Sequence, residues 1–219
     1  MTFSIAARLA DAQMFGVAIA SSSPAVAARC AHVRAGVGAV ATQNITDPSL
    51  GPRILGSLER GAGVHAALDD ALHATAFGDY RQLLIVGRTG PAVVHSGAYS
   101  LGIVSSALGV DSAAAGNLLA RPEVPAAMVA AFEAGTGHFG ARLLQALRAA
   151  VDLGGEAGPI HSAGVLIARE LSWPIVDLRV DWADEDPIAR LTSIWDIYAP
   201  QIDDYVQRAI APAHAPGFV

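Results

Sequence analysis

The order of the predicted strands and helices constrains the fold of this chain more than any other feature of its sequence. Alternating apolar and polar residues predict strands, and apolar residues that recur about every 3.6 positions predict helices. The predicted strands cover residues 2–10, 15–20, 34–42, 82–88, 91–97, 102–108, 162–169 and 174–181. The predicted helices cover residues 52–61, 63–75, 122–134, 138–152 and 187–209. Because two helix pairs interrupt mostly antiparallel strands, we expect an α+β fold in four layers, with sheets inside and helices outside.

The length of the chain suits a single domain. A chain of 219 residues can enclose a full core, and no linker, internal repeat or low-complexity tract divides it. We therefore expect one domain over residues 1–219. No apolar run approaches the roughly 18 residues that a membrane span requires. The N-terminus also lacks the charged and apolar regions of a signal peptide, so we expect no export and no membrane partner.

The net charge and the cysteine content limit the cellular compartment and the kinds of binding partner. A net charge of −6 without a basic stripe argues against nucleic acid as a partner. The lone Cys30 excludes an internal disulfide and suits a reducing cytoplasm. Hydrophobic residues make up 53% of the chain and charged residues only 16%, which favours contacts between copies of the chain. We expect a cytoplasmic homodimer or larger homo-oligomer.

The chain begins with Met1, and Thr2 opens the first predicted strand. Methionine aminopeptidases usually remove Met when the next residue is as small as threonine, which would leave a free α-amino group beside the Thr2 hydroxyl. Such an amine has a pKa of about 7.7–8.0, so near neutral pH it can act as a base for its own side chain. Thr2 is therefore a candidate nucleophile, although many cytosolic proteins begin Met-Thr without using the threonine chemically.

Several segments together resemble one protein family. They are MTFSIAAR at residues 1–8, GVAIAS at 16–21, RAGVGAVATQ at 34–43, GPR at 51–53, GNL at 116–118 and DLRVD at 177–181. This set is similar to the uncharacterised bacterial and archaeal family called domain of unknown function one-zero-two-eight, which is grouped with the N-terminal-nucleophile (Ntn) hydrolases. The resemblance implies an αββα sandwich of mostly antiparallel sheets, and it implies no known reaction.

The resemblance to well-understood Ntn hydrolases such as proteasome subunits is weaker. Those enzymes pair the terminal threonine with an Asp that ends the second strand and a Lys on the third. Here Ser21 ends the second predicted strand, and Arg34 is the nearest cation on the third. An arginine can stabilise a developing oxyanion but cannot shuttle a proton. We therefore take Thr2, Ser21 and Arg34 as catalytic candidates in a site unlike that of the proteasome.

Four further residues are candidates for substrate binding, each with a structural alternative. Asn117, predicted to lie on a loop of small residues, can donate to an oxyanion or simply adopt a left-handed turn. Arg53 follows Pro52 at a predicted helix start, where it can hold a carboxylate or merely belong to a well-formed helix end. Gln43 can orient a ligand or occupy a turn, and Ser162 can line a cleft beside a glycine-rich loop.

The remaining chemistry-bearing residues predict no cofactor. The seven histidines show no metal-ligand spacing, and no glycine-rich phosphate loop opens a helix. Arg29 and His32 could lower the pKa of Cys30, although a buried, inert thiol is the commoner case. We expect neither a metal nor a cofactor.

Two functions from different classes remain. The first is an Ntn-type amidohydrolase with Thr2 as nucleophile, acting on a small amide or peptide-like bond. Some family members resemble fusions with peptidoglycan-binding modules, so a peptidoglycan-derived amide is a further alternative. The second is a non-catalytic oligomeric protein that keeps the fold and binds a small amide or carboxylate ligand.

Overall fold

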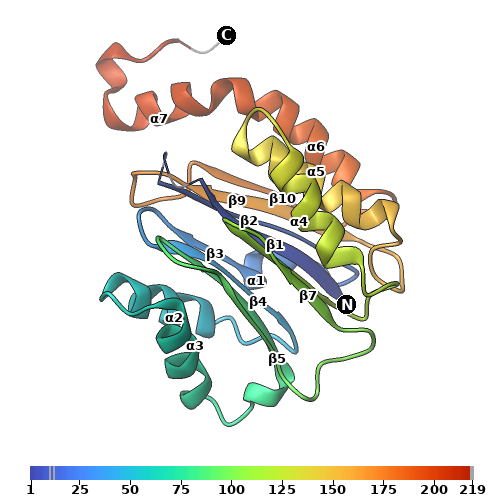
Figure 1. Ribbon diagram of the computed structural model, residues 1–219. Helices are drawn as coiled ribbons and strands as arrows, with labels where there is room; N and C mark the ends of the chain where they lie inside the picture. The colour runs from blue at the N-terminus through green and yellow to red at the C-terminus, as the bar shows by residue number, and fades with distance from the viewer. Residues whose placement is uncertain (10, 12, 218–219) are drawn as a thin grey trace.

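Two stacked antiparallel sheets form the centre of the molecule, and helices cover their outer faces (Figure 1). The computed structural model describes residues 1–9, 11 and 13–217. Within them, six strands form one sheet in the order β10-β9-β2-β1-β8-β7, and four form the other in the order β3-β4-β5-β6. Both sheets are antiparallel throughout, as the mixed α+β expectation requires.

The elements have the following bounds. The strands are β1 Thr2–Leu9, β2 Met14–Ser21, β3 Ala31–Arg34, β4 Gly38–Asn44, β5 Arg81–Gly87, β6 Val93–Ser96, β7 Ser105–Leu108, β8 Ser112–Asn117, β9 Ser162–Ala168 and β10 Val176–Val180. The α-helices are α1 Val26–Cys30, α2 Leu50–Glu59, α3 Val64–His73, α4 Val124–Ala134, α5 Phe139–Asp152, α6 Pro187–Tyr198 and α7 Ile202–Ile210. Short 3-10 helices cover Gly78–Tyr80, Ala199–Gln201 and Pro212–His214.

Three apolar clusters hold these layers together. Helices α4, α5 and α6 pack on the outer face of the six-stranded sheet, where Phe3 and Ile5 of β1 meet Phe132 and Leu143. Helices α2 and α3 cover the outer face of the four-stranded sheet. Between the sheets, the core consists largely of alanine and valine and also encloses the short helix α1. Small side chains allow the two sheets to pack closely, and this places buried polar groups of one sheet beside those of the other.

Strand β1 lies near the centre of the six-stranded sheet and fixes the register around Thr2. It pairs with β2 on one side, with Phe3 opposite Ala20, and with β8 on the other, with Thr2 opposite Asn117. Because side chains alternate along a strand, Thr2 and Ser4 point toward the four-stranded sheet while Phe3 points toward the helices. The N-terminus therefore lies at one end of the space between the sheets.

The third predicted strand is wrong in its extent. Residues 34–42 do not form one strand, because the chain turns at Gly36, whose φ of +68° is a conformation that favours glycine. The result is the hairpin of β3 and β4, preceded by the helix α1 that the sequence did not indicate.

The segment around Asn117 was also predicted wrongly, as a loop. It is β8, an inner strand between β1 and β7. Ala113 and Ala115 face the other sheet and Ala114 faces the helices, so both sides are buried and no alternation of apolar and polar residues marks the strand.

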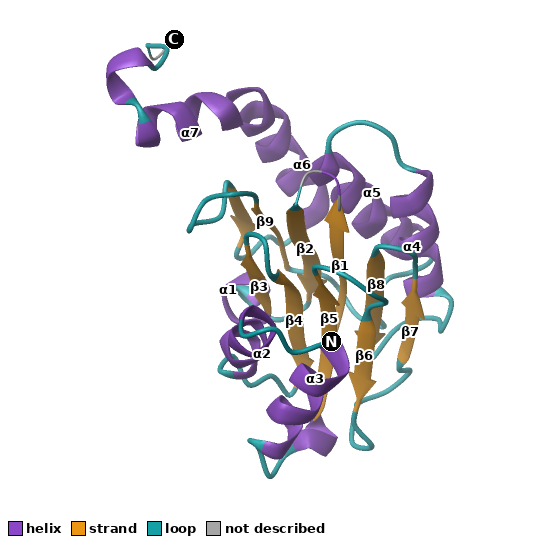
Figure 2. Ribbon diagram, turned by 60° about the vertical axis from the view of Figure 1, so that its left-hand side comes forward, coloured by secondary structure: helices purple, strands orange, loops and turns teal. Residues whose placement is uncertain are grey.

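The C-terminal helix differs from the prediction as well. The predicted helix over residues 187–209 is divided into α6 and α7 by the 3-10 turn that contains Pro200. Helix α7 extends beyond the sheets, as Figures 1 and 2 both show. In the part of the chain that the structure describes, no helix is long and apolar enough to cross a membrane. Residue 10, the last of the first predicted strand, lies outside the described residues.

Candidate active site at the N-terminus

Four polar residues form a row across one end of the six-stranded sheet. Thr2 of β1 lies opposite Asn117 of β8, and Ser21 at the end of β2 lies opposite Ser162 of β9. We call these four residues the polar row. All of them are buried and lie on the face of the sheet that meets the four-stranded sheet. Three of the sequence candidates, from separate parts of the chain, are thus brought to the candidate nucleophile.

The hydroxyl groups of Thr2 and Ser21 converge on one carbonyl group. Their oxygens lie 3.2 Å apart. Thr2 Oγ1 donates a 2.5 Å hydrogen bond to the carbonyl oxygen of Met1, and Ser21 Oγ donates to the same oxygen. Ser21 Oγ also accepts a 3.0 Å bond from the N–H of Ser23, which fixes its position. Two hydroxyls therefore already hold the carbonyl of the peptide bond that precedes Thr2.

Gln43 belongs to a network of buried amides rather than to an open ligand site. Its Oε1 accepts a 2.7 Å bond from Ser4, and its Nε2 donates to Gln82 Oε1 at 2.7 Å and to the carbonyl of Ala115. Gln82 in turn donates to Ser96 Oγ at 2.9 Å and to the carbonyl of Gly116. We call Ser4, Gln43 and Gln82 the amide network. Because its hydrogen-bonding groups are satisfied by the two sheets, its role is to join them.

Asn117 connects the polar row to the amide network. Its Nδ2 donates a 3.1 Å hydrogen bond to Gln82 Oε1, so this amide group is engaged inside the protein and not aimed at a substrate oxyanion. Its Oδ1, by contrast, has no hydrogen-bond partner among the described residues. The side chain is nearly fully buried, and this unpaired acceptor lies in the same row as Thr2.

Ser162 has a structural role at the other end of the polar row. Its Oγ donates a 2.6 Å bond to the carbonyl of Ser23 and accepts a bond from the N–H of Val26. These contacts anchor the segment between β2 and α1. They use the hydroxyl within the fold, so its predicted place in a ligand cleft has no support in the geometry.

Arg34 lies at the wrong end of the sheet to act on Thr2. It pairs with Gly38, whereas Gln43, the residue that reaches β1, lies five residues further along β4. At about 3.4 Å per residue, that is a separation of roughly 17 Å. The Arg34 guanidinium forms a 2.6 Å ion pair with Glu59 on the surface.

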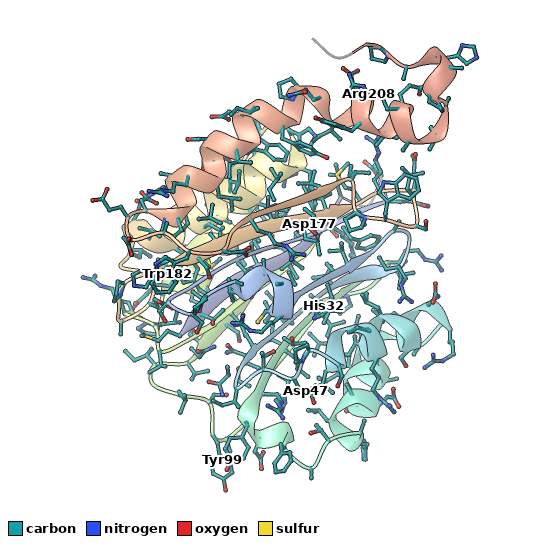
Figure 3. The ribbon with its side chains drawn as sticks, turned by 180° about the vertical axis from the view of Figure 1, so that it is seen from behind. His32, Asp47, Tyr99, Asp177, Trp182 and Arg208 are labelled. Atoms are coloured by element: carbon teal, nitrogen blue, oxygen red, sulfur yellow. The ribbon has the colours of Figure 1, made fainter. Side chains whose placement is uncertain are left out.

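Arg53 is also remote from the polar row. It lies on α2, on the outer side of the four-stranded sheet, and forms a 2.8 Å exposed ion pair with Asp70. Helix α2 begins at Leu50, so Pro52 is its third residue and not its first. The neighbouring Gly51 permits close packing instead, because a Cβ there would lie 2.2 Å from the ring of His32, the half-buried histidine labelled in Figure 3.

A buried carboxyl that the sequence did not single out lies beside the N-terminus. Glu156 is only 3% exposed, and neither of its oxygens makes a hydrogen bond of normal geometry within the described residues. Burial raises the pKa of Glu156 to about 7, and the terminal ammonium of Met1, the hydroxyl and N–H of Ser22 and the ring of His161 oppose that rise. Glu156 can thus gain or lose a proton near neutral pH.

The backbone fixes Glu156 next to the polar row. Glu156 forms a β-bridge with Leu119, and the N–H of Ala157 donates a 2.8 Å bond to the carbonyl of Leu118. Leu118 and Leu119 directly follow Asn117, the strand partner of Thr2. Since the glycine-rich loop at residues 154–158 shows no strand or helix pattern, only the tertiary structure brings this carboxyl to Thr2.

Comparison with known proteins places the chain in a family. The model of a family of unknown function, DUF1028, matches residues 2–191. This chain belongs to the DUF1028 family. The crystal structure of protein SPO2555 from Silicibacter pomeroyi, described with the same family model, is 28% identical in sequence. The structural match covers 90% of this chain and 89% of the SPO2555 chain, with a TM-score of 0.84. A search of curated proteins finds no significant match.

The other reactive groups of this DUF1028 protein lie away from the polar row or are shielded. Burial raises the pKa of the Cys30 thiol, and this outweighs the opposing effects of Thr46 and Arg29. The hypothesis of a low-pKa cysteine is therefore wrong, and the thiol is an inert part of the core between the sheets.

A cavity of about 370 Å³ lies between the α2–α3 turn and the β5–β6 turn, near Glu59 and far from Thr2. Asp177 (Figure 3) and Arg179 pair with each other at 2.6 Å within the edge strand β10.

Proposed function

We propose that this DUF1028 protein is an amidohydrolase of the Ntn type, which cleaves a small amide or peptide-like bond with Thr2 as nucleophile once Met1 has been removed. The observation that supports this most directly is the convergence of the Thr2 and Ser21 hydroxyls on one amide carbonyl oxygen. The proposal includes the αββα sandwich of that superfamily, with which the stacked sheets and outer helices agree.

The proposed reaction needs no group beyond the N-terminal residue and its neighbours. The neutral α-amine of Thr2 accepts the proton of Oγ1, and the Oγ1 oxygen then attacks the carbonyl carbon of the substrate. The carbon–nitrogen bond then breaks as the α-amine passes its proton to the leaving amine. Water hydrolyses the resulting ester on Thr2, and Ser21 donates a hydrogen bond to the substrate oxygen throughout. Arg34 and the amide of Asn117 have no part in these steps.

A non-catalytic ligand-binding protein is the second candidate. The observation that favours it is the occupation of both hydroxyls by the Met1 carbonyl, which closes the site as long as Met1 is present. In this case the polar row would bind a small amide without cleaving it.

We also propose that the protein is a cytoplasmic homo-oligomer. Large apolar side chains are exposed along the segment before β8, including Tyr99 (Figure 3), Leu108 and Val110. Burying such side chains against a second copy would be favourable. Sedimentation of the purified protein measures this directly, and a monomer at all concentrations would contradict it.

The decisive experiment combines intact mass with turnover. Protein that has lost Met1 is compared with Thr2→Ala and Thr2→Ser variants on a panel of small amides. We expect Thr2→Ala to lower turnover by at least about 100-fold, because it removes the nucleophile, and to leave the melting temperature nearly unchanged. Thr2→Ser keeps a hydroxyl and should retain activity. Thr89→Ala, at an exposed turn, is the matched control. Unchanged turnover in Thr2→Ala would exclude Thr2 as the nucleophile.

A further inference from the structure

Met1 occupies the candidate active site as an aminoacyl group whose carbonyl and side chain both contact the protein. Its carbonyl oxygen accepts hydrogen bonds from Thr2 and Ser21. Its thioether lies over Gly158, where an added Cβ would be 2.9 Å from Cε and 3.3 Å from Sδ. Its ammonium acts on the Glu156 carboxyl only at longer range, since no ion pair joins the two groups among the described residues. The carbonyl and the side chain thus each contact a different feature of the protein, and the α-amine lies within electrostatic range of a buried carboxyl.

The loop that carries Glu156 and Gly158 is shaped around the N-terminal residues. A Cβ added at Gly155 would lie 3.2 Å from the ring of Phe3, so the loop approaches β1 closely on this side too. A Cβ at position 158 would come within 2.9 Å of the end of the Met1 side chain, so a larger residue there would require that end to shift. The loop therefore lies along one side of the space that Met1 occupies.

Glu156 gives this space a preference for a positive charge. Among the described residues, the buried carboxylate of Glu156 has no hydrogen bond of normal geometry, which is unfavourable, and a nearby ammonium relieves that cost. The His161 ring also lies within electrostatic range of Glu156, but its Nδ1 bonds the carbonyl of Ala183 at 2.9 Å and its ring stacks on Trp182 at 4.2 Å. The ammonium of Met1 supplies a full positive charge in this space, and removal of Met1 takes it away.

We propose, on the basis of the hydrolase function above, that the space vacated by Met1 binds the acyl part of substrates with a free α-amino group. The substrate class is then α-aminoacyl amides: amino-acid amides or the amino ends of short peptides. The ammonium binds at Glu156, the side chain lies over Gly158, and the carbonyl meets Thr2 and Ser21. Thr2 Oγ1 forms an ester with the aminoacyl carbon as the amide bond breaks, and water then releases the free amino acid.

The test uses protein that has lost Met1 and two substrates that differ by one group. Methionine p-nitroanilide carries the α-amino group, and its deamino analogue has hydrogen in that position. We expect wild-type protein to prefer methionine p-nitroanilide in kcat/KM. Glu156→Gln should lower kcat/KM for that substrate by roughly 10- to 100-fold, the worth of a charge-assisted contact, and change that for the analogue by less than about 3-fold. Glu185→Gln, at an exposed position, is the control and should change neither.

Two results would overturn the inference. One is an equal loss on both substrates in Glu156→Gln, which would mean that Glu156 acts on Thr2 or on folding and not on the substrate amine. The other is a wild-type preference for the deamino analogue. A Gly158→Val variant adds a second readout, since it should weaken methionine p-nitroanilide more than glycine p-nitroanilide.

Binding measurements separate this inference from the proposed function. Thr2→Ala protein that has lost Met1 is titrated calorimetrically with methionine amide, with and without the Glu156→Gln change. Binding that depends on Glu156, without turnover of any substrate by wild type, would overturn the hydrolase proposal and support amine recognition. Turnover of both substrates without any dependence on Glu156 would do the reverse. The absence of both binding and turnover would overturn both.

Discussion

The amide network and Glu156 are both buried and polar, yet they differ in how their hydrogen bonds are satisfied. Each amide of the network is bonded by the two sheets, with Gln82 alone linking Gln43, Asn117 and Ser96. Glu156 makes no hydrogen bond of normal geometry among the described residues, although it is buried to a similar degree. The first region stabilises the fold, whereas the second retains an unfavourable group beside the candidate nucleophile.

This difference separates structural polarity from candidate chemistry. A satisfied buried network rigidifies the interior, and an unsatisfied buried acid lowers stability unless a ligand compensates it. Such a cost at the end of the inter-sheet space is typical of a site that exists for binding. We therefore expect opposite effects on stability. A substitution in the amide network should lower it, and a substitution of Glu156 should raise it.

The largest expected effect follows from breaking the amide network. Gln82→Leu removes bonds to two side-chain amides, one hydroxyl and one backbone carbonyl. Because the buried partners are left unpaired, we expect the free energy of unfolding to fall by about 3 kcal/mol. Urea denaturation measures the loss. Gln145→Leu, at an exposed position on α5, is the matched control, and an equal loss in both variants would contradict a special role for the network.

The opposite sign is expected at Glu156. The folded-state pKa is raised from 4.5 to about 7, so the folded state holds this proton more tightly than the unfolded state. Below pH 4.5 this tighter binding contributes fully to the free energy of unfolding. The contribution is lost as the pH rises through the folded-state pKa of about 7. Glu156→Gln cannot ionise, so at pH 8 it should be more stable than wild type by roughly 2 kcal/mol, and by much less at pH 5.

Urea denaturation of both proteins at the two pH values measures this difference. Glu123→Gln, at an exposed position, should show no comparable pH-dependent gain. A Glu156→Gln variant that is less stable than wild type at pH 8 would mean that the carboxylate has favourable partners and that the contrast with the amide network fails.

The smallest effect is expected at Arg34, which belongs to neither region. Its ion pair with Glu59 is exposed on both sides, so Arg34→Met should change the free energy of unfolding by less than about 0.5 kcal/mol. The same variant should leave Thr2-dependent turnover unaltered, because Arg34 lies at the far end of β4. A loss of turnover in Arg34→Met would restore the role that the sequence suggested for this residue.

The sequence predicted well those elements whose patterns depend on local chemistry. The alternation around Phe3 and the helical spacing in the two helix pairs place most strands and helices within a few residues of their observed bounds. The family assignment also rested on local motifs, and it is confirmed over residues 2–191. Strand β8 was not predicted, because a run of alanines buried on both faces has no alternation of apolar and polar residues. The turn at Gly36 escaped because small residues on both sides of it looked like one strand.

The candidate site was predictable only in part, because local patterns do not encode which distant side chains the fold brings together. Thr2 and Ser21 were found because one begins the first strand and the other ends the second, and hairpin pairing brings such ends together. Gln43, Arg53 and Ser162 were chosen for their chemistry, but the structure directs their side chains into the fold or away from Thr2.

The sequence by itself determined most of the order of strands and helices, without α1, β8 and the β3–β4 hairpin, and the position of Thr2 at the start of the central strand. The tertiary structure alone decided that Glu156 lies at the N-terminus, because a loop more than 150 residues away along the chain reaches Thr2 only through the pairing of β1 with β8 and the bridge at Leu119. It also decided the charge of that carboxyl, since a pKa depends on burial and neighbours that no local pattern encodes.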